Sequence, residues 1–234
     1  MSRTVFITGG NRGIGLGVAR AFAETGDKVA VSYRTGEPPE GLFAVRCDVT
    51  DTDSVKAAFE EVRAEYGPVE VLVANAGINR EGLLLGMSEQ DFYDVVDTNL
   101  MGAVRCVKQA MEDMVRKRWG RLIFISSTVG FSGSPAQSNY AATKAALMGV
   151  ARSLAWELGG RNITVNVVYP GYIDTDMTRV ITDKRRESLI SQIPLRRIGS
   201  VEEVTGMVRF LASDAASYVT GALVPVTGGL GMGH

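Results

Sequence analysis

Short apolar runs rich in β-branched residues alternate with longer stretches of helical pattern, and this alternation limits the possible folds more than any other feature of the chain. The runs are Val5-Phe6-Ile7, Val29-Ala30-Val31, Val69 to Ala74, Leu122 to Ile125, Ile163 to Val168 and Leu223 to Val226. Such a rhythm is typical of βαβ units, in which a helix crosses over between parallel strands. Runs such as Val71-Leu72-Val73 have no polar face, so we expect helices on both sides of the sheet.

The helical stretches can be placed between these runs. They are Gly13 to Thr25, Asp51 to Tyr66, Ser88 to Asn99 continuing through Arg118, Ser138 to Leu158, and Val201 to Ser213. We therefore predict an α/β fold with a seven-stranded, mostly parallel sheet between two helical layers. A chain of 234 residues with 45% hydrophobic residues suits one domain, residues 1–234, better than two small ones. The weakly patterned stretch from Tyr172 to Ser200 is interpreted as a substrate lid.

Composition excludes several classes of function. A net charge of −1 gives no overall field for a nucleic-acid backbone, so nucleic acid is not an expected partner. Cys47 and Cys106 lack the CxxC spacing and the number typical of a secreted disulfide framework. The sole histidine, His234, leaves no Ser-His-Asp relay and no histidine-rich metal site, and we expect no metal. No apolar run reaches membrane-spanning length, so we expect a cytoplasmic protein with no membrane contact.

A glycine-rich turn, Thr8 to Gly15, follows the first expected strand and opens the first expected helix. Free backbone N–H groups and the positive end of the helix dipole can hold a pyrophosphate there, and glycines let the backbone approach it closely. The alternative is a strand-to-helix turn without a ligand. Its position directly after a strand favours a dinucleotide site.

The end of the second strand distinguishes the two nicotinamide dinucleotides, because an acidic residue there accepts from a ribose hydroxyl and a basic one accommodates a 2′-phosphate. The chain places Arg34 at this point, and no carboxylate follows before Glu37. Arg12 in the glycine turn is a second cation that can approach the phosphate. This pattern favours NADP(H) over NAD(H). The alternative is that both arginines are ordinary surface charges.

Tyr140 and Lys144 are four residues apart in a helical pattern, so they lie on one face of the helix, one turn from each other. A neighbouring ammonium, helped by the positive charge of an oxidised nicotinamide, favours the phenolate, and we expect the two to lower the pKa of the tyrosine and make it a usable general acid. The alternative is a packed aromatic residue beside a solvated amine, which is common on helices.

Taken in order, these features resemble the short-chain dehydrogenase/reductase family, which has a Rossmann fold. The features that carry the resemblance are the glycine turn, Asn75-Ala76-Gly77 after the fourth strand, Ser127 after the fifth, Tyr140 with Lys144, Pro170-Gly171 after the sixth, and Gly228-Gly229 after the last. The resemblance covers essentially the whole chain. On its own, Asn75-Ala76-Gly77 could equally be a tight turn at a strand end.

The resemblance implies roles for matching residues. Tyr140 would be the acid/base, Lys144 would bind the nicotinamide ribose, Ser127 would bind the substrate carbonyl, and Asn99 would support a water-linked proton relay. Asp48 and Val49 would contact adenine, and Ile173 and Thr175 the carboxamide. The full set of implied cofactor-binding residues is Gly9, Asn11, Arg12, Gly13, Ile14, Gly15, Arg34, Asp48, Val49, Asn75, Ala76, Gly77, Tyr140, Lys144, Pro170, Gly171, Ile173 and Thr175.

Within the family, three stretches are similar to the β-ketoacyl-[acyl-carrier-protein] reductases of fatty-acid synthesis. They are Asn139 to Lys144, Asn166 to Met177, and Gly221 to Gly229. The last four residues, Gly231 to His234, and Arg34 resemble the actinobacterial, mycolic-pathway branch. Tyr169 departs from the alanine common before Pro-Gly in those enzymes, which leaves the shape of the pocket open. The resemblance implies NADPH-dependent reduction of a 3-oxoacyl thioester.

The same resemblance implies acyl carrier protein as a partner, because Arg118 and Arg161 match basic positions that receive this acidic protein. The alternative for Arg116-Lys117-Arg118 is that the cations complement the end of a helix dipole. Arg185 and Arg186 in the lid are further candidates. The lid also carries apolar residues that could cover an acyl chain, namely Met177, Val180, Leu189, Ile190 and Ile193.

The family implies a homotetramer, joined through surfaces at Ala145 to Trp156 and Val201 to Val226. Two other functions stay open at this point. One is NADPH-dependent reduction of another ketone, such as a polyketide or xenobiotic carbonyl, by the same residues. The other is a non-catalytic NADP(H)-sensing protein, which would not need Ser127, Tyr140 and Lys144.

Overall fold

The computed structural model describes residues 2–175, 178 and 182–232. Met177, Val180 and His234, which the sequence singled out, lie outside the described residues, as do Asp176 and Gly233 in the stretches used for the resemblance. In the described part of the chain, seven strands form one sheet in the order β3-β2-β1-β4-β5-β6-β7. The strands are β1 (Thr4–Ile7), β2 (Lys28–Tyr33), β3 (Phe43–Arg46), β4 (Val71–Ala74), β5 (Gly120–Ile125), β6 (Ile163–Pro170) and β7 (Leu223–Val226).

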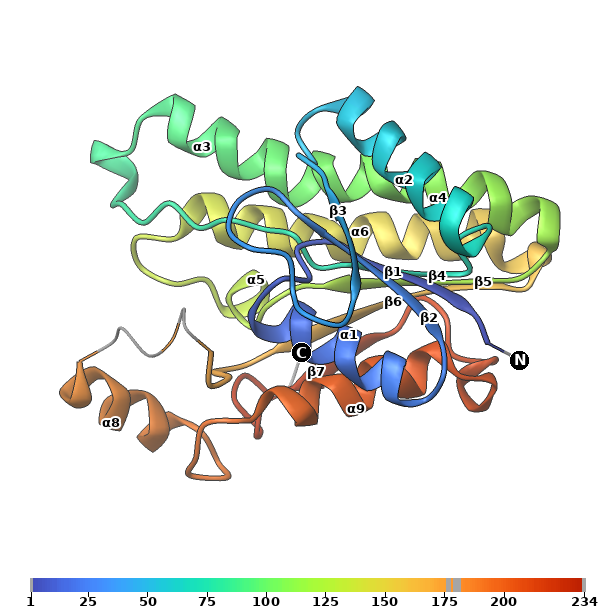
Figure 1. Cartoon of the computed structure of the whole chain (residues 1–234). Coiled ribbons are helices and arrows are strands. Elements are labelled where there is room, and N and C mark those ends of the chain that lie inside the picture. Colours follow the sequence, from blue (N-terminus) through green and yellow to red (C-terminus); the bar gives the residue numbers. More distant parts are fainter. Residues whose placement is uncertain (1, 176–177, 179–181, 233–234) are drawn as a thin grey trace.

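Two layers of helices cover the sheet. The helices are α1 (Gly13–Glu24), α2 (Thr52–Tyr66), α3 (Glu89–Val96), α4 (Gly102–Lys117), α5 (Val129–Ser132), α6 (Ser138–Leu158), α8 (Asp183–Gln192) and α9 (Val201–Ala212). Short turns named η1 (Leu84–Gly86), η2 (Asp97–Met101), η3 (Gly159–Arg161) and η4 (Asp214–Ala216) complete the regular elements. Figure 1 shows α1 and α9 on one face of the sheet and α2, α3, α4 and α6 on the other. The predicted Rossmann-type α/β fold is confirmed.

The core divides into two clusters because side chains alternate across each strand. Val5 and Ile7 pack with Phe22 of α1 and Val208 of α9 on one face. Phe6 lies between them in sequence but packs on the other face with α2, α4 and α6, and its ring meets Phe59 edge to face. The strands are apolar on both faces for this reason.

The chain reverses its direction of sheet growth at β1. After β3 it returns to pair β4 with the other side of β1, so the carboxyl ends of β1 and β4 border the point where the strand order changes. Open α/β sheets bind ligands at such a point. The glycine turn after β1 and Asn75 after β4 both lie there.

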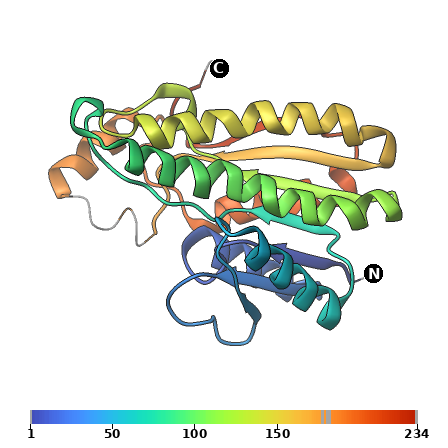
Figure 2. The same cartoon turned by 90° about the horizontal axis from the view of Figure 1, so that it is seen from above.

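Three details differ from the expectation. All strand pairings of this sheet in the described residues are parallel, whereas the sequence predicted a mostly parallel sheet. β3 is a short edge strand that was not among the apolar runs, and it buries Val45 fully but Phe43 and Ala44 only in part. The stretch from Tyr172 to Ser200 contains a helix, α8, and the views in Figures 1 and 2 agree that it stands outside both helical layers.

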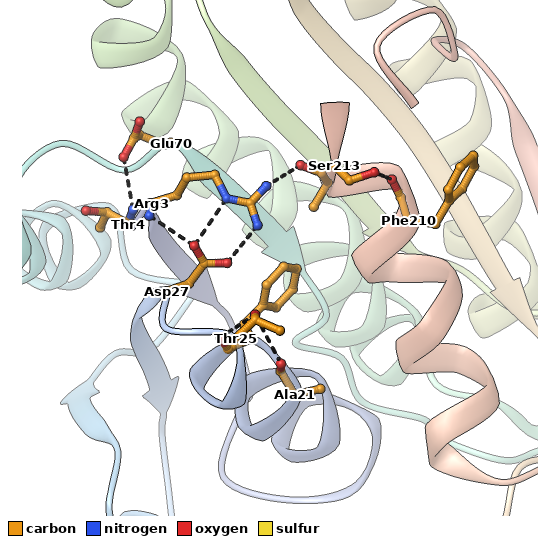
Figure 3. A network of polar contacts seen from close by, with 10 residues as sticks. Arg3, Thr4, Ala21, Thr25, Asp27, Glu70, Phe210 and Ser213 are labelled. Carbon is orange, nitrogen blue, oxygen red and sulfur yellow. Dashed lines mark hydrogen bonds and ion pairs between the residues drawn. The ribbon is translucent and has the colours of Figure 1, made fainter. Parts of the chain in front are cut away.

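The amino edge of the sheet carries a paired charge network, seen from close by in Figure 3. Arg3 at the entry of β1 contacts Asp27 at 2.7 Å and 3.2 Å through two of its nitrogens, and the Asp27 side chain is only 6% exposed. Glu70 accepts from the Thr4 N–H at 3.0 Å and pairs with Lys117 at the end of α4. Opposite charges neutralise each other at this edge.

Candidate active site

The glycine turn brings the start of α1 against the loop that follows β4. Gly9 has a φ of +62°, and a β-carbon there would lie 3.0 Å from the Ala76 Cα. A β-carbon on Gly15 would lie 2.5 Å from the Gly9 carbonyl oxygen. The N-terminus of α1 has no side-chain cap and no acidic residue in its first turn. Its backbone N–H groups are therefore suited to an anionic ligand.

Thr8, the first residue of the predicted glycine turn, to which the sequence assigned no side-chain role, connects this turn to the β4 loop. Its hydroxyl oxygen accepts from the backbone N–H groups of Asn75 and Ala76, both at 3.0 Å. The Asn75 amide donates in return to the carbonyls of Thr8 and Gly9 at 2.9 and 3.0 Å. The sequence signal for this role was a hydroxyl directly after the apolar run of β1. The two glycine-containing loops are thus held as one unit.

Arg34 and Asp48 stand at the adjoining strand ends. Arg34 is exposed at the end of β2, and its guanidinium lies 3.8 Å from the Asp48 carboxylate. Burial raises the pKa of Asp48, but hydrogen bonds from Thr50 and the charge of Arg34 outweigh it, so the net pKa is lowered. Val49 is buried beside Gly102 at the start of α4. Arg12 is exposed as the residue before α1.

Tyr140 and Lys144 share the first turns of α6, as predicted from their spacing. The Lys144 Nζ lies 5.5 Å from the centre of the Tyr140 ring and donates to the Ile125 carbonyl at 2.8 Å. The side chain is buried, and this burial lowers the pKa of Lys144 to about 8. A cation at this place has little water around it.

The expected lowering of the Tyr140 pKa is wrong for the chain by itself. Burial raises the pKa of Tyr140, and the opposing hydrogen bond with Ser127 does not offset it. Desolvation disfavours the phenolate more strongly than sequence spacing suggested, because the spacing says nothing about how much water the hydroxyl meets. The phenol is therefore held in its protonated form.

Asn99 lies where the long predicted helix from Ser88 to Arg118 is interrupted. Residues Asp97–Met101 form a π-helical turn, a feature often found at functional sites. The Asn99 side chain accepts from the Ile78 N–H at 2.8 Å and donates to the Ile78 carbonyl at 2.9 Å and to Thr143 Oγ1 at 3.2 Å. This residue joins the β4 loop to α6.

Gly77 shows that the two halves of the site are contiguous. A β-carbon there would lie 3.1 Å from Asn99 Oδ1 and 3.7 Å from Lys144 Nζ. Its neighbour Ala76 contacts Gly9 of the glycine turn. The structure therefore brings the Tyr140 and Lys144 pair and the glycine turn to the same edge of the sheet.

Ser127 lies in the loop between β5 and the short helix α5. Its Oγ accepts from the Val129 N–H at 3.2 Å, and its carbonyl accepts from the Gly130 N–H at 3.0 Å. The preceding residue, Ser126, donates its hydroxyl to the Lys144 carbonyl at 2.8 Å, which fixes β5 against α6. The sequence analysis assigned no role to Ser126 or Thr143, whose side chains bind α6 and Asn99. The only sequence signal for them was a polar residue within an otherwise buried pattern.

The segment after β6 closes the other side of the glycine turn. Gly171 donates to the Val226 carbonyl at 2.9 Å, and Pro170 accepts from the Thr128 N–H at 3.0 Å. Ile173 is buried and bridges to Gly199. A β-carbon on Gly13 would lie 3.8 Å from the Thr175 methyl carbon, which places Thr175 over the start of α1.

Arg118 and Arg161 do not join this group. Arg118 precedes β5 and donates to the Gly160 carbonyl at 3.1 Å, and Arg161 precedes β6. Both therefore lie together at the amino edge of the sheet, whereas Ser127 follows the carboxyl end of β5. Arg118 has a φ of +54° and caps α4, which agrees with the structural alternative for the basic run.

Comparison with known proteins agrees with this geometry. The family described as Enoyl-(Acyl carrier protein) reductase matches residues 9–231. A 3-oxoacyl-[acyl-carrier-protein] reductase of Mycobacterium tuberculosis, MabA, is 51% identical over 234 residues, which cover 100% of this chain and 95% of the relative. The chain belongs to the short-chain dehydrogenase/reductase family. The family prediction is confirmed.

Other short-chain dehydrogenase/reductase relatives are similar over the same span. The 3-oxoacyl-[acyl-carrier-protein] reductase MabA of Mycobacterium avium is also 51% identical, over 100% of this chain and 92% of its own length. The corresponding reductase FabG of Staphylococcus aureus is 44% identical over 99% of each chain. As a member of this family, the chain is an oxidoreductase.

The described residues offer neither a membrane-spanning helix nor a metal-binding cluster. No helix within residues 2–175, 178 and 182–232 is long and apolar enough to cross a membrane. In the same part of the chain, no group of three or more histidine, cysteine, aspartate or glutamate side chains is arranged to hold a metal ion.

Proposed function

We propose that this chain is an NADPH-dependent 3-oxoacyl-[acyl-carrier-protein] reductase of fatty-acid biosynthesis. The observation that carries the proposal is the contiguity of Ser127, Tyr140, Lys144 and Asn99 with the glycine turn, through Gly77 and Ala76. The names of relatives that are 44% and 51% identical over nearly the whole chain support this substrate class. We infer a cytoplasmic location from this pathway and from the free thiols of Cys47 and Cys106.

The described residues fit a nicotinamide dinucleotide. Glycine at positions 9 and 15 lets the turn pack closely against Ala76 and on itself, where a β-carbon would lie within 3.0 Å of other atoms. The N-terminus of α1 is uncapped, so its backbone N–H groups can bind a pyrophosphate. Asn75 to Gly77 and Thr175 border the same turn, and Lys144 lies next to Gly77. Arg34 is exposed at the end of β2, where a cation favours the 2′-phosphate of NADP(H).

The bound dinucleotide would supply a hydride to the carbonyl carbon of the substrate. Ser127 and Tyr140 would donate hydrogen bonds to the carbonyl oxygen, where negative charge develops. Burial keeps the Tyr140 phenol protonated but also makes it a weaker acid, and it would transfer its proton to that oxygen as negative charge develops there. The Lys144 ammonium, 5.5 Å from the ring, would stabilise the phenolate left behind.

Asn99 would support a water-linked proton relay that leads to Lys144. Its amide ties the Ile78 backbone to Thr143, one residue before Lys144 on α6. The stretch from Tyr172 to Ser200, with α8, would act as a substrate lid, and residues 1–234 would form a single domain. These roles remain predictions.

Arg118 and Arg161 lie at the edge of the sheet opposite Ser127. An acyl carrier protein bound to them would therefore deliver its substrate to the active site of another copy of the chain. Tyr140 lies in the first turn of α6, and Leu158 ends the helix 18 residues later, a length of about 27 Å at about 1.5 Å per residue. A homotetramer would bring a neighbouring site within reach. Large side chains on the two expected surfaces support assembly, since Trp156 is 91% exposed and Tyr218 fully exposed. Arg185 and Arg186 on α8 are the alternative within one chain.

The test is oxidation of NADPH with acetoacetyl thioester carried on acyl carrier protein, run beside crotonyl thioester and a simple ketone. We expect the acetoacetyl thioester to be the preferred substrate and NADPH to be preferred to NADH. Enoyl reduction is the second candidate, because the matching family description names it. Preference for crotonyl thioester would support that candidate. Preference for the simple ketone, or no NADPH oxidation with any of the three, would contradict the proposal.

A further inference from the structure

Tyr169 occupies a place beside the candidate site that the proposed mechanism does not use. It lies near the end of β6, where it is only 6% exposed. Val165 and Val167 belong to the cluster that packs against α6, and Val168 belongs to the opposite cluster. Alternation along the strand therefore directs Tyr169 to the face of the sheet that α6 covers. This is the face that carries Tyr140 and Lys144.

The ring of Tyr169 packs against Phe131 of α5. Their ring centres are 4.3 Å apart, and the planes are tilted by 44°. Phe131 lies four residues after Ser127, and its N–H donates to the Thr128 carbonyl at 2.9 Å. The aromatic pair is therefore attached directly to the loop that would hold the substrate carbonyl.

On its other side, α5 is fixed against the turn that carries Lys144. A β-carbon on Gly130 would lie 2.9 Å from the Ala145 nitrogen and 2.9 Å from the Lys144 carbonyl carbon. The short helix has little freedom to move toward α6. The Phe131 and Tyr169 pair is therefore attached to a helix whose position beside α6 is fixed.

Tyr169 also borders a hollow. Its other lining residues are Pro225, which pairs in register with Tyr169, and the segment Thr227 to Met232. Apart from Thr227, these residues are apolar or glycine. A 3-oxoacyl thioester has an alkyl arm on one side of the reacting carbonyl and a polar thioester arm on the other. The alkyl arm is the one that this lining suits.

We propose that Tyr169, with Phe131, is a specificity-determining wall that limits how far the alkyl arm of the substrate extends beside Ser127. The inference rests on the proposed function, because it assumes a 3-oxoacyl substrate. Removing the ring would join the space it fills to the hollow. Each further buried methylene group is worth up to about fourfold in kcat/KM.

The experiment measures kcat/KM with NADPH for 3-oxoacyl-coenzyme A thioesters of four to twelve carbons. We expect Tyr169→Ala to raise the ratio of the ten-carbon to the four-carbon substrate about tenfold or more, chiefly through a lower KM. Tyr169→Phe is the matched control, since it keeps the ring and is expected to keep the wild-type ratio. If Tyr169→Ala does not fold, as judged by its melting temperature, Tyr169→Leu and Phe131→Leu test the same wall with smaller changes.

Three outcomes would overturn the inference. An unchanged chain-length ratio in a folded variant would reject the wall, and an equal fall in kcat for every substrate would show that Tyr169 only positions α5 and Ser127. A change in oligomeric mass with no change in the ratio would identify the hollow as an interface between copies. If the wild-type chain turned over no 3-oxoacyl thioester of any length, the proposed function itself would fail.

Discussion

Arg3 and Asp27 neutralise each other at the amino edge of the sheet, whereas at the carboxyl edge the buried Lys144 ammonium meets the neutral carbonyl of Ile125. Both edges are rich in polar groups, yet they handle charge differently. A paired charge gains stability from its partner, while a desolvated cation beside a carbonyl costs stability. Such a cost is typical of sites that keep charge available for a ligand. The comparison separates residues that stabilise the fold from residues proposed to take part in the reaction.

The sharpest way to break this comparison is to change Tyr140 to Phe. The ring still packs, but the proton donor is lost, so we expect turnover to fall about a thousandfold. NADPH binding, followed by fluorescence titration, is expected to stay within about twofold, because Phe keeps the contacts of the ring. Turnover close to the wild-type value would reject Tyr140 as the acid.

Lys144→Met tests the cost of the buried cation. Burial lowers the Lys144 pKa from 10.5 to about 8, so the unfolded chain holds this proton more tightly than the folded chain. The stability cost is fully present below about pH 8 and is relieved as the pH rises toward the unfolded pKa. We expect Lys144→Met to exceed the wild type in unfolding free energy by on the order of 3 kcal/mol at pH 7.

The measurement for this variant is urea unfolding at a series of pH values. The stability difference from the wild type should shrink as the pH rises from about 8 to about 10. Lys56→Met, which changes an exposed lysine of α2, is the control and should show no such trend. A difference that stays constant with pH would contradict a cation desolvated in the folded chain.

Asp27→Ala probes the other edge of the sheet. Because Asp27 is buried and contacts Arg3 through both oxygens, we expect a loss of about 2 kcal/mol in unfolding free energy. Activity below the melting temperature should not change, since the pair lies at the edge opposite Tyr140. Glu112→Ala removes an exposed pair with Arg116 and should cost only about 0.3 kcal/mol. Equal losses in the two variants would erase the distinction between the edges.

Local patterns allowed much of the fold and part of the site to be predicted. The apolar runs indicated the strands, and the spacing of Tyr140 and Lys144 placed them on one helical face, because both depend only on residues close in sequence. The sequence analysis did not predict β3, because an edge strand needs fewer apolar residues than a central one. The hydrogen bonds of Thr8, Ser126 and Thr143 were not predicted, because their partners come from elements far away in sequence.

Arg118 and Arg161 show a second limit of sequence reasoning. Their matching positions suggested a carrier surface, but only the strand directions reveal that they stand at the edge opposite Ser127. The position of a residue before or after a strand becomes meaningful once all strands are known to run in parallel. For this reason the proposed contacts of these arginines with a carrier protein require an assembly of several copies of the chain.

The sequence by itself determined the βαβ order, the glycine turn after β1 and the tyrosine and lysine on one helical face, since each follows from short-range spacing and chain stereochemistry. Only the tertiary structure decided which loops meet at the carboxyl edge, where a β-carbon on Gly77 would meet both Asn99 and Lys144. It also decided that the Tyr140 pKa rises rather than falls. Desolvation depends on all the atoms packed around a group, and these come from segments that no local pattern connects.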